Sequence, residues 1–214
     1  NDAGKNQSNG VVISGTTATI DGAIVGATVF IDINHDGVAQ ANEIIGTSNQ
    51  FGHLDFVVDL SKLDANGDGQ FVIGEARAVL SGGTDVDTHL TYLINLYGPA
   101  GASVITPLTS LLQPLLEEGR DLTSATALLI AHLGLPADSH LLSLNPIEGS
   151  HLVMGQNASV MTAAVQFSEL LAHELGTDEA HASFTVFSAI SHAITSLPDG
   201  QVADFSNPVL LHSI

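Results

Sequence analysis

Short apolar runs separated by Gly, Asn and Asp fill the chain from about residue 10 to residue 105. The runs include VVI, TATI, ATVFI, HLDFVVDL and SVIT, and each has the length of a single strand. Within LTYLINL the apolar residues alternate, which predicts a half-buried strand over 90–96. We therefore predict a β-sandwich over residues 15–105, preceded by a linker over residues 1–14.

After residue 106 the apolar residues follow a helical period instead. Thr106 suits an N-cap and Pro107 suits the first helical position, while Gly119 ends the pattern. Further helices are predicted over about 121–133, over 151–175 and after GTDEAH. The third of these four helices is expected to bury Val160, Met161, Ala164, Val165, Leu171 and Leu175.

These patterns predict an α+β fold in which about four helices over residues 106–214 form a C-terminal layer. We expect this layer to pack against a calcium-bound N-terminal sandwich and to form one combined ligand-binding module with it. A groove between the two layers would suit an extended peptide end.

The charge of the chain is strongly one-sided. Its 214 residues include 23 Asp and Glu against 4 Lys and Arg, so the net charge is −19, although 44% of the residues are hydrophobic. The hydrophobic content excludes a disordered chain, and the shortage of positive charge excludes binding to nucleic acid and to anionic membranes. The absence of cysteine excludes disulfides, thiolate metal sites and thiol catalysis. No apolar run is long enough to span a bilayer, and the surplus of carboxylates favours bound divalent cations.

Two stretches have the spacing of EF-hand calcium loops, with oxygen ligands at positions 1, 3, 5, 7 and 12 and Gly at position 6. We name residues 32–43 the first loop and residues 64–75 the second loop. The first loop offers Asp32, Asn34, Asp36, the carbonyl of Val38, and Glu43. The second loop offers Asp64, Asn66, Asp68, the carbonyl of Gln70, and Glu75. Because Asp, Asn and Gly also form ordinary hairpin turns, one match alone would be weak, but two full matches predict two or more bound calcium ions.

The two loops differ at position 9. Gln40 in the first loop can reach a metal ion or hold a water on it, whereas Val72 in the second loop cannot. The second loop is therefore expected to hold the more open ion, and Arg77 follows it closely in sequence. An open ion and a guanidinium could bind a carboxylate together, although the open place could equally hold water.

The stretch SGGTDVDT, residues 81–88, is a further candidate. Asp85 and Asp87 could bind another calcium ion, and the alternative is a polar β-turn.

The residues around the two loops indicate which family of calcium-binding modules the chain resembles. A dockerin module would place a helix after each loop, but the first loop is followed by IIGTSNQFGHLDFVVDL, which is typical of a turn and a strand. The order DGAIVGATVFIDINHDGVAQANE, GTSNQFGHLDF, GGTD, GPAGASVITPLTSLL and LGLP resembles the calcium-dependent peptide-binding domain of giant RTX adhesins, over residues 16–200. The GGTD match implies ligand contacts at Gly83, Thr84 and Asp85, next to Gly82.

This resemblance implies a binding module of a large bacterial surface adhesin that captures peptide or protein C-termini on host or neighbouring cells. It also implies an extracellular place on the cell surface, secretion by a type I system, and a monomeric module within a longer chain. The opening NDAGKNQSNG is typical of a linker, so we expect the sequence to be part of a larger secreted protein.

Other functions remain open at this point. The module could be a structural spacer that calcium only stiffens, or it could bind a glycan. An enzyme is not expected, because AHELGTDEAH has Thr177 where a zinc-protease motif needs a histidine, and no G-x-S-x-G motif is present.

Overall fold

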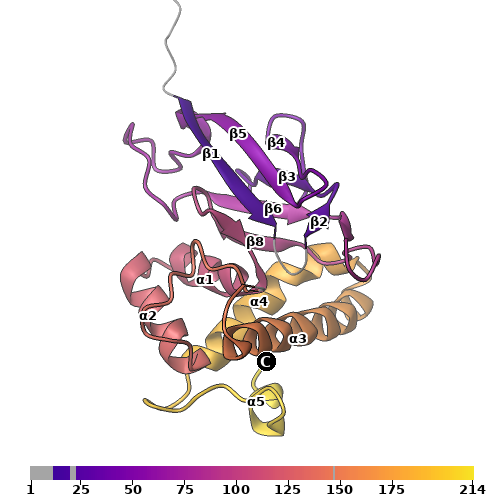
Figure 1. The fold of residues 1–214 in the computed structure, drawn as a ribbon, viewed down its shortest axis with the longest axis vertical. Helices are drawn as coiled ribbons and strands as arrows, with labels where there is room; N and C mark the ends of the chain where they lie inside the picture. The colour runs from indigo at the N-terminus through magenta and orange to yellow at the C-terminus, as the bar shows by residue number, and fades with distance from the viewer. Residues whose placement is uncertain (1–11, 20–22, 147) are drawn as a thin grey trace, which may run out of the picture.

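A computed structural model describes residues 12–19, 23–146 and 148–214 of the chain. Its strands come first and its α-helices follow, and Figure 1 shows the strands at one end of the molecule and the helices at the other. The strands are β1 (Val12–Thr19), β2 (Ile24–Val25), β3 (Thr28–Ile31), β4 (Ile44–Thr47), β5 (His53–Asp59), β6 (Arg77–Ser81), β7 (Thr84–Asp85), β8 (Leu96–Pro99) and β9 (Val104–Ile105). The short 3-10 helix η1 (Leu60–Lys62) follows β5.

The strands form a four-stranded sheet in the order β4-β3-β6-β8, a three-stranded sheet in the order β5-β1-β9, and the small pair β2-β7. All pairings in the four-stranded sheet are antiparallel, whereas β1 pairs antiparallel with β5 and parallel with β9. Along β5 the side chains of Leu54 and Val58 are buried and their neighbours are more exposed, as a strand with one covered face requires. Buried residues of both larger sheets belong to one hydrophobic core.

The helices are α1 (Pro107–Glu117), α2 (Leu122–Leu133), α3 (His151–Leu175), α4 (Glu179–Thr195) and the short α5 (Pro208–His212). The predicted start of α1 is confirmed, because the hydroxyl of Thr106 accepts a hydrogen bond from the amide of Thr109 and Pro107 opens the helix. Helix α1 is buried from Pro107 to Leu115 and lies at the centre of the helical part, in contact with β8, α2, α3 and α4.

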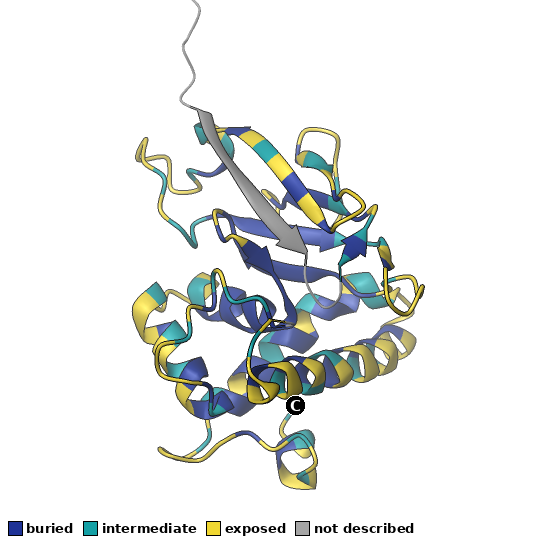
Figure 2. Cartoon of the chain, viewed as in Figure 1, coloured by how far each residue is buried: buried dark blue, intermediate teal, exposed yellow. Residues whose placement is uncertain are grey.

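The four-stranded sheet lies between the three-stranded sheet and the helices (Figure 1). Its strand β8 packs against α1, and the ring of Tyr97 on β8 makes edge-to-face contacts with Phe184 and Phe187 of α4, at 5.0 and 6.1 Å between ring centroids. Figure 2 shows β8 and most of α1 in the dark blue of buried residues. The predicted α+β fold with a C-terminal helical layer is thus confirmed. Where β8 meets α1 and α4, packed side chains occupy the space in which a ligand groove was expected.

Three local predictions need correction. Strand β1 begins at Val12, within the predicted linker of residues 1–14, of which residues 1–11 lie outside the described chain. The alternating stretch 90–96 is mostly a loop, in which Leu90 and Leu93 are 68% and 61% exposed, and β8 begins only at Leu96. Helix α3 buries Val160 and Ala164 as predicted and partly buries Met161 and Leu171, but it exposes Val165 and Leu175. Its buried face also includes Val153, Asn157, Ala163, Ser168 and Ala172.

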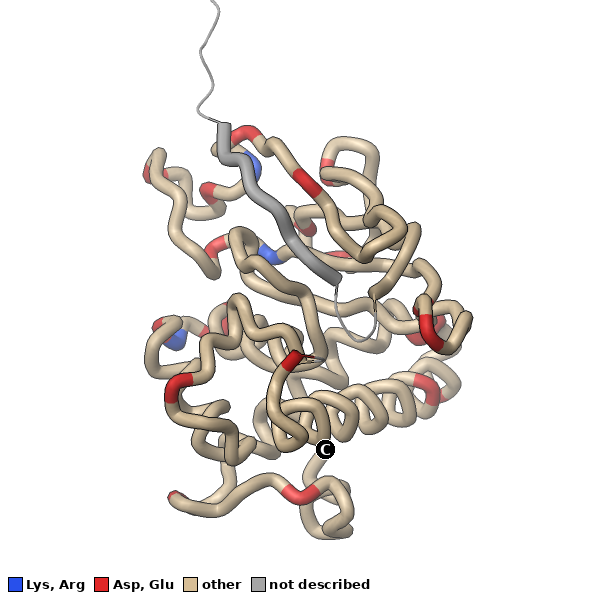
Figure 3. Tube along the Cα trace, viewed as in Figure 1, with Lys and Arg blue, Asp and Glu red and all other residues tan. Residues whose placement is uncertain are grey.

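Charged residues lie mainly in the loops and at the ends of the helices and strands (Figure 3). The described chain has three basic residues, Lys62, Arg77 and Arg120, of which Arg77 is buried. Among the described residues, no helix combines the length and the apolar character that crossing a membrane requires.

Candidate metal centre

The first and second loops have the same backbone hydrogen bonds. In each loop the amides at positions 5 and 6 donate to the two carboxylate oxygens at position 1, which is Asp32 or Asp64, over 2.8–3.1 Å. The amide at position 7 donates to the carboxylate at position 5 over 2.8 Å in both loops. The first loop joins the antiparallel strands β3 and β4, so it takes the place of a hairpin turn.

Left-handed backbone at positions 4 and 6 allows both turns. Position 6 is glycine in each loop, with φ of 72° at Gly37 and 80° at Gly69. Position 4 is Gly67 in the second loop, with φ of 77°, but it is His35 in the first loop, with φ of 61°. A residue other than glycine is strained in this conformation and keeps it only where the surrounding structure holds the backbone in place. The backbone at His35 is therefore held by its neighbours in the first loop.

The second loop brings three carboxylates together. Asp64, Asp68 and Glu75 each offer one oxygen, and the three oxygens lie within 4.8 Å of one another. The side-chain amide of Asn66 contacts Glu75 and so lies beside them. Within the described chain this is the one group of three or more His, Cys, Asp or Glu residues that converges in this way. A set of oxygen donors alone suits a hard cation such as calcium.

The second loop is also open to solvent. Asp68 is exposed and Asp64 and Glu75 are partly buried, while Val72 at position 9 is 53% exposed and offers no side-chain ligand. A cation bound by these carboxylates would therefore be reachable from outside the protein.

Close packing at two glycines holds the second loop against the rest of the protein. Gly101, with φ of 92°, lies against Phe71, and a Cβ at Gly101 would be 2.6 Å from the ring of Phe71. Gly74, with φ of 103°, lies against Leu116 of α1 in the same way, at 3.0 Å. The loop is thus exposed at its ligand end and fixed at its base.

The first loop is buried at its two ends, Asp32 and Glu43, while Asn34, His35 and Asp36 between them are exposed. Asp32 and Glu43 are each 1% exposed. The two oxygens of Glu43 accept hydrogen bonds from the amides of Ile33 and Gln40, at 3.0 and 3.2 Å, and the side chain of Gln40 donates to Asp36 over 2.9 Å. The first loop has the ligand types of a calcium site, but its acids do not form a cluster like that of the second loop among the described residues.

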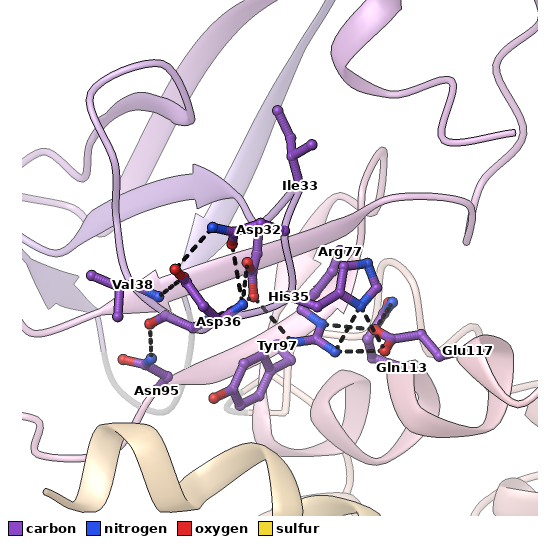
Figure 4. A network of polar contacts seen from close by, with 12 residues as sticks. Asp32, Ile33, His35, Asp36, Val38, Arg77, Asn95, Tyr97, Gln113 and Glu117 are labelled. Carbon is purple, nitrogen blue, oxygen red and sulfur yellow. Dashed lines mark hydrogen bonds and ion pairs between the residues drawn. The ribbon is translucent and has the colours of Figure 1, made fainter. Parts of the chain in front are cut away.

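Arg77 lies at the first loop, not at the second loop that it follows in sequence (Figure 4). Its guanidinium donates to Asp32 over 3.0 Å and to both carboxylate oxygens of Glu117 over 2.7 and 2.5 Å. It also lies 3.2 Å from Nδ1 of His35 and 3.6 Å above the ring centroid of Phe184. With 3% exposure and all three guanidinium nitrogens engaged, Arg77 is not free to bind a ligand, which corrects its expected role beside an open ion.

The ion pairs of Arg77 shift the pKa values of Arg77 and Glu117 so that both groups stay charged. Burial alone would lower the pKa of Arg77, but the hydrogen bond and charge of Glu117 and the charge of Asp32 outweigh it and raise this pKa. Burial likewise favours a raised pKa for Glu117, but hydrogen bonds from Arg77 and Gln113 outweigh it and lower that pKa. The side chain of Glu117 is 20% exposed.

Asn95 is a second contact between the first loop and the rest of the fold. Its side-chain amide donates to the carbonyl of Gly37 over 3.1 Å, and its backbone amide donates to Ser183 of α4 over 3.3 Å. The sequence analysis identified neither Asn95 nor Glu117. Asn95 and Glu117 could have been found as polar residues next to apolar segments of the sequence, because a buried polar group needs a hydrogen-bond partner.

Residues 82–88 form a polar turn packed on the core. A Cβ at Gly83 would lie 2.8 Å from both Ala27 and Ile24, so close packing accounts for this glycine. One oxygen of Asp85, which is 5% exposed, accepts hydrogen bonds from the amides of Asp87 and Thr88 and from the hydroxyl of Thr88. Between the calcium and the turn readings of Asp85 and Asp87, the contacts favour the turn.

The ligand contacts expected at Gly83, Thr84 and Asp85 lie on or beside β7. Thr84 is exposed and pairs with Val25 of β2, while Gly83 and Asp85 have the packing and turn roles described above. Comparison with protein-family models, with curated proteins and with solved structures gives no match for this chain.

Proposed function

We propose that the chain is a calcium-dependent binding module of a large bacterial surface adhesin, and that it captures short peptide C-termini on other cells. In this proposal the module acts outside the cell, within a longer chain that a type I system secretes. Calcium in the second loop meets the ligand, and calcium in the first loop stabilises the fold.

One observation carries the proposal most directly: Asp64, Asp68 and Glu75 converge within 4.8 Å at an exposed loop. Calcium accepts six to eight oxygen ligands, and Val72 contributes no side-chain oxygen at position 9. A peptide carboxylate supplies oxygen ligands of the kind that calcium prefers, and the positive ion offsets the negative charge of the peptide carboxylate. This attraction matters because the net charge of −19 would otherwise repel an anionic ligand.

The burial of Asp32 and Glu43 in the first loop favours a second candidate, a spacer in which calcium only stiffens a surface fibre. Asp32 and Glu43 are each 1% exposed, so two of the acids that would hold an ion there face the protein interior. The two candidates differ in the second loop, which is needed for ligand capture in the first candidate and merely stabilising in the spacer.

A peptide array with free and amidated C-termini tests the proposal. The protein is applied with calcium, and then with EDTA at a level that leaves it folded by circular dichroism. The same array is probed with a second-loop variant, Asp64→Asn with Glu75→Gln, and with the matched first-loop variant Glu43→Gln. We expect binding that requires calcium, a free carboxylate and an intact second loop, and that tolerates the first-loop change.

Binding to amidated peptides, or binding that survives the second-loop changes, would contradict the proposed contact between ion and carboxylate. Retention of no peptide under any condition would leave the spacer or a glycan-binding module, which a glycan array distinguishes.

A further inference from the structure

The carboxylate of Asp32 faces two ways. One oxygen accepts a hydrogen bond from the amide of Asp36 inside the first loop, over 3.1 Å. The other accepts hydrogen bonds from the amide of Gly37, over 3.1 Å, and from Arg77, over 3.0 Å. Asp32 therefore connects the interior of the first loop to a buried guanidinium.

Arg77 extends this connection to two helices. Both carboxylate oxygens of Glu117, at the end of α1, accept from it, and the ring of Phe184 on α4 lies against its face. Figure 4 shows the guanidinium between the first loop and the helical side of the sheet, with Tyr97 next to it. A paired and stacked guanidinium is rigid, so it restricts the orientations that Asp32 can adopt.

We propose that Arg77 is a positioning residue for a divalent cation in the first loop, and that it couples binding of this cation to the packing of α1 and α4 on the sheet. The inference rests on calcium binding by the first loop, as in the proposed function. Its physical basis is that hydrogen-bond partners behind a metal ligand fix the orientation of that ligand and raise its affinity for the metal.

The sign of the effect separates positioning from simple electrostatics. Arg77 is a positive charge next to a cation site, so Coulomb repulsion alone predicts that its removal tightens calcium binding. Positioning predicts the opposite, because Asp32 loses its fixed orientation. The variant Arg77→Met removes the charge and keeps much of the aliphatic volume, so the two effects give opposite results.

Calcium titration calorimetry tests this in a background where Asp64→Asn with Glu75→Gln disables the second loop. We expect Arg77→Met to weaken calcium binding at the first loop by about 10- to 100-fold. Arg120→Met is the matched control, because it removes the same charge from an exposed position and is expected to leave the affinity within about twofold.

Phe184→Leu is the second variant, because it removes the ring under the guanidinium without changing any charge. We expect it to weaken calcium binding several-fold, and it keeps the test available if Arg77→Met fails to fold. Hydrogen exchange of α1 and α4 amides gives an independent readout, with protection that rises on calcium addition in the background protein and does not rise in Arg77→Met.

Unchanged or tighter binding by Arg77→Met, with native circular dichroism, would overturn the role of Arg77 while leaving calcium binding intact. If the background protein itself binds no calcium, both this inference and the first-loop ion fail, while the second-loop ion of the proposed function is tested separately by the peptide array.

Discussion

The first and second loops share a motif and a set of backbone hydrogen bonds, yet the acids at their two ends lie in different surroundings. In the first loop the acids at positions 1 and 12, Asp32 and Glu43, are buried, and Asp32 is bonded to Arg77. In the second loop the acids at the same positions, Asp64 and Glu75, are only partly buried. Only in the second do three carboxylates converge among the described residues. The comparison teaches that a loop motif specifies local geometry, while the packing around the loop decides between a structural and a ligand-facing site.

Removal of calcium should have the largest effect and tests whether either loop binds it. A site held at a thousandfold excess of calcium over its Kd contributes about 4 kcal/mol to stability, which corresponds to roughly 10 °C in Tm for a chain of this size. We expect EDTA to lower the Tm by at least this amount in differential scanning fluorimetry, with recovery on addition of excess calcium. A melting curve that chelation does not move would contradict calcium binding by both loops.

Replacing the aspartate at position 1 should separate the two loops. Asp32→Asn weakens the buried pair with Arg77, so we expect a loss of about 3 kcal/mol in the free energy of unfolding, measured with urea in EDTA. Asp64→Asn, the matched change in the more exposed loop, should cost about 1 kcal/mol under the same conditions. Equal losses would show that the different surroundings of the two loops have no energetic consequence.

Gly101→Ala should disturb the second loop alone. The φ of 92° strains alanine, and its Cβ would lie 2.6 Å from the ring of Phe71, so we expect a loss of about 2 kcal/mol together with weaker calcium binding by the second loop. Gly82→Ala is the matched control, because its φ is 67° but no atom lies within 4 Å of the added Cβ. Calcium titration of both variants measures the affinity of the second loop. If Gly82→Ala weakens this affinity as much as Gly101→Ala does, Phe71 does not anchor the loop.

Acid should produce the smallest effect and reports on the first loop. The pKa of Glu117 is lowered in the folded protein, so its stabilising contribution is present above the unfolded pKa and is lost as the pH falls through the folded pKa. We expect Glu117→Gln to be less stable than the parent protein at pH 7, and the difference to shrink towards zero in acid. Urea unfolding from pH 7 to pH 3 measures it, and a difference independent of pH would refute the ion pair with Arg77 as its source.

Much of the fold was predictable because its signals are local. Caps and periodicity placed α1, including its start at Thr106 and Pro107, and the short apolar run HLDFVVDL placed β5. The stretch 90–96 was predicted wrongly because alternation does not reveal whether a neighbouring strand is available, and Leu90 and Leu93 lie in a loop that faces solvent. The bounds of helix α3 were predicted correctly, but part of its buried face was not, because close packing against α4 also buries small residues such as Ala163 and Ser168.

In the candidate metal centre, too, the features set by neighbouring residues were predictable and those set by distant contacts were not. The motif predicted the ligand positions and the turn geometry of both loops, because these depend on neighbouring residues. The partnership of Arg77 with Asp32 and Glu117 joins residues 45 and 40 positions apart, and no local pattern encodes such a contact. Sequence proximity therefore assigned Arg77 to the wrong loop.

Counting bound ions by native mass spectrometry tests the central claim most directly. The matched variants Glu43→Gln and Glu75→Gln each change the glutamate at position 12, which binds calcium through two oxygens. The account predicts two calcium ions on the parent protein, one on each variant, and peptide binding lost only with Glu75→Gln. A parent protein without bound calcium, or a Glu75→Gln variant that keeps both its ions and its peptide, would contradict it.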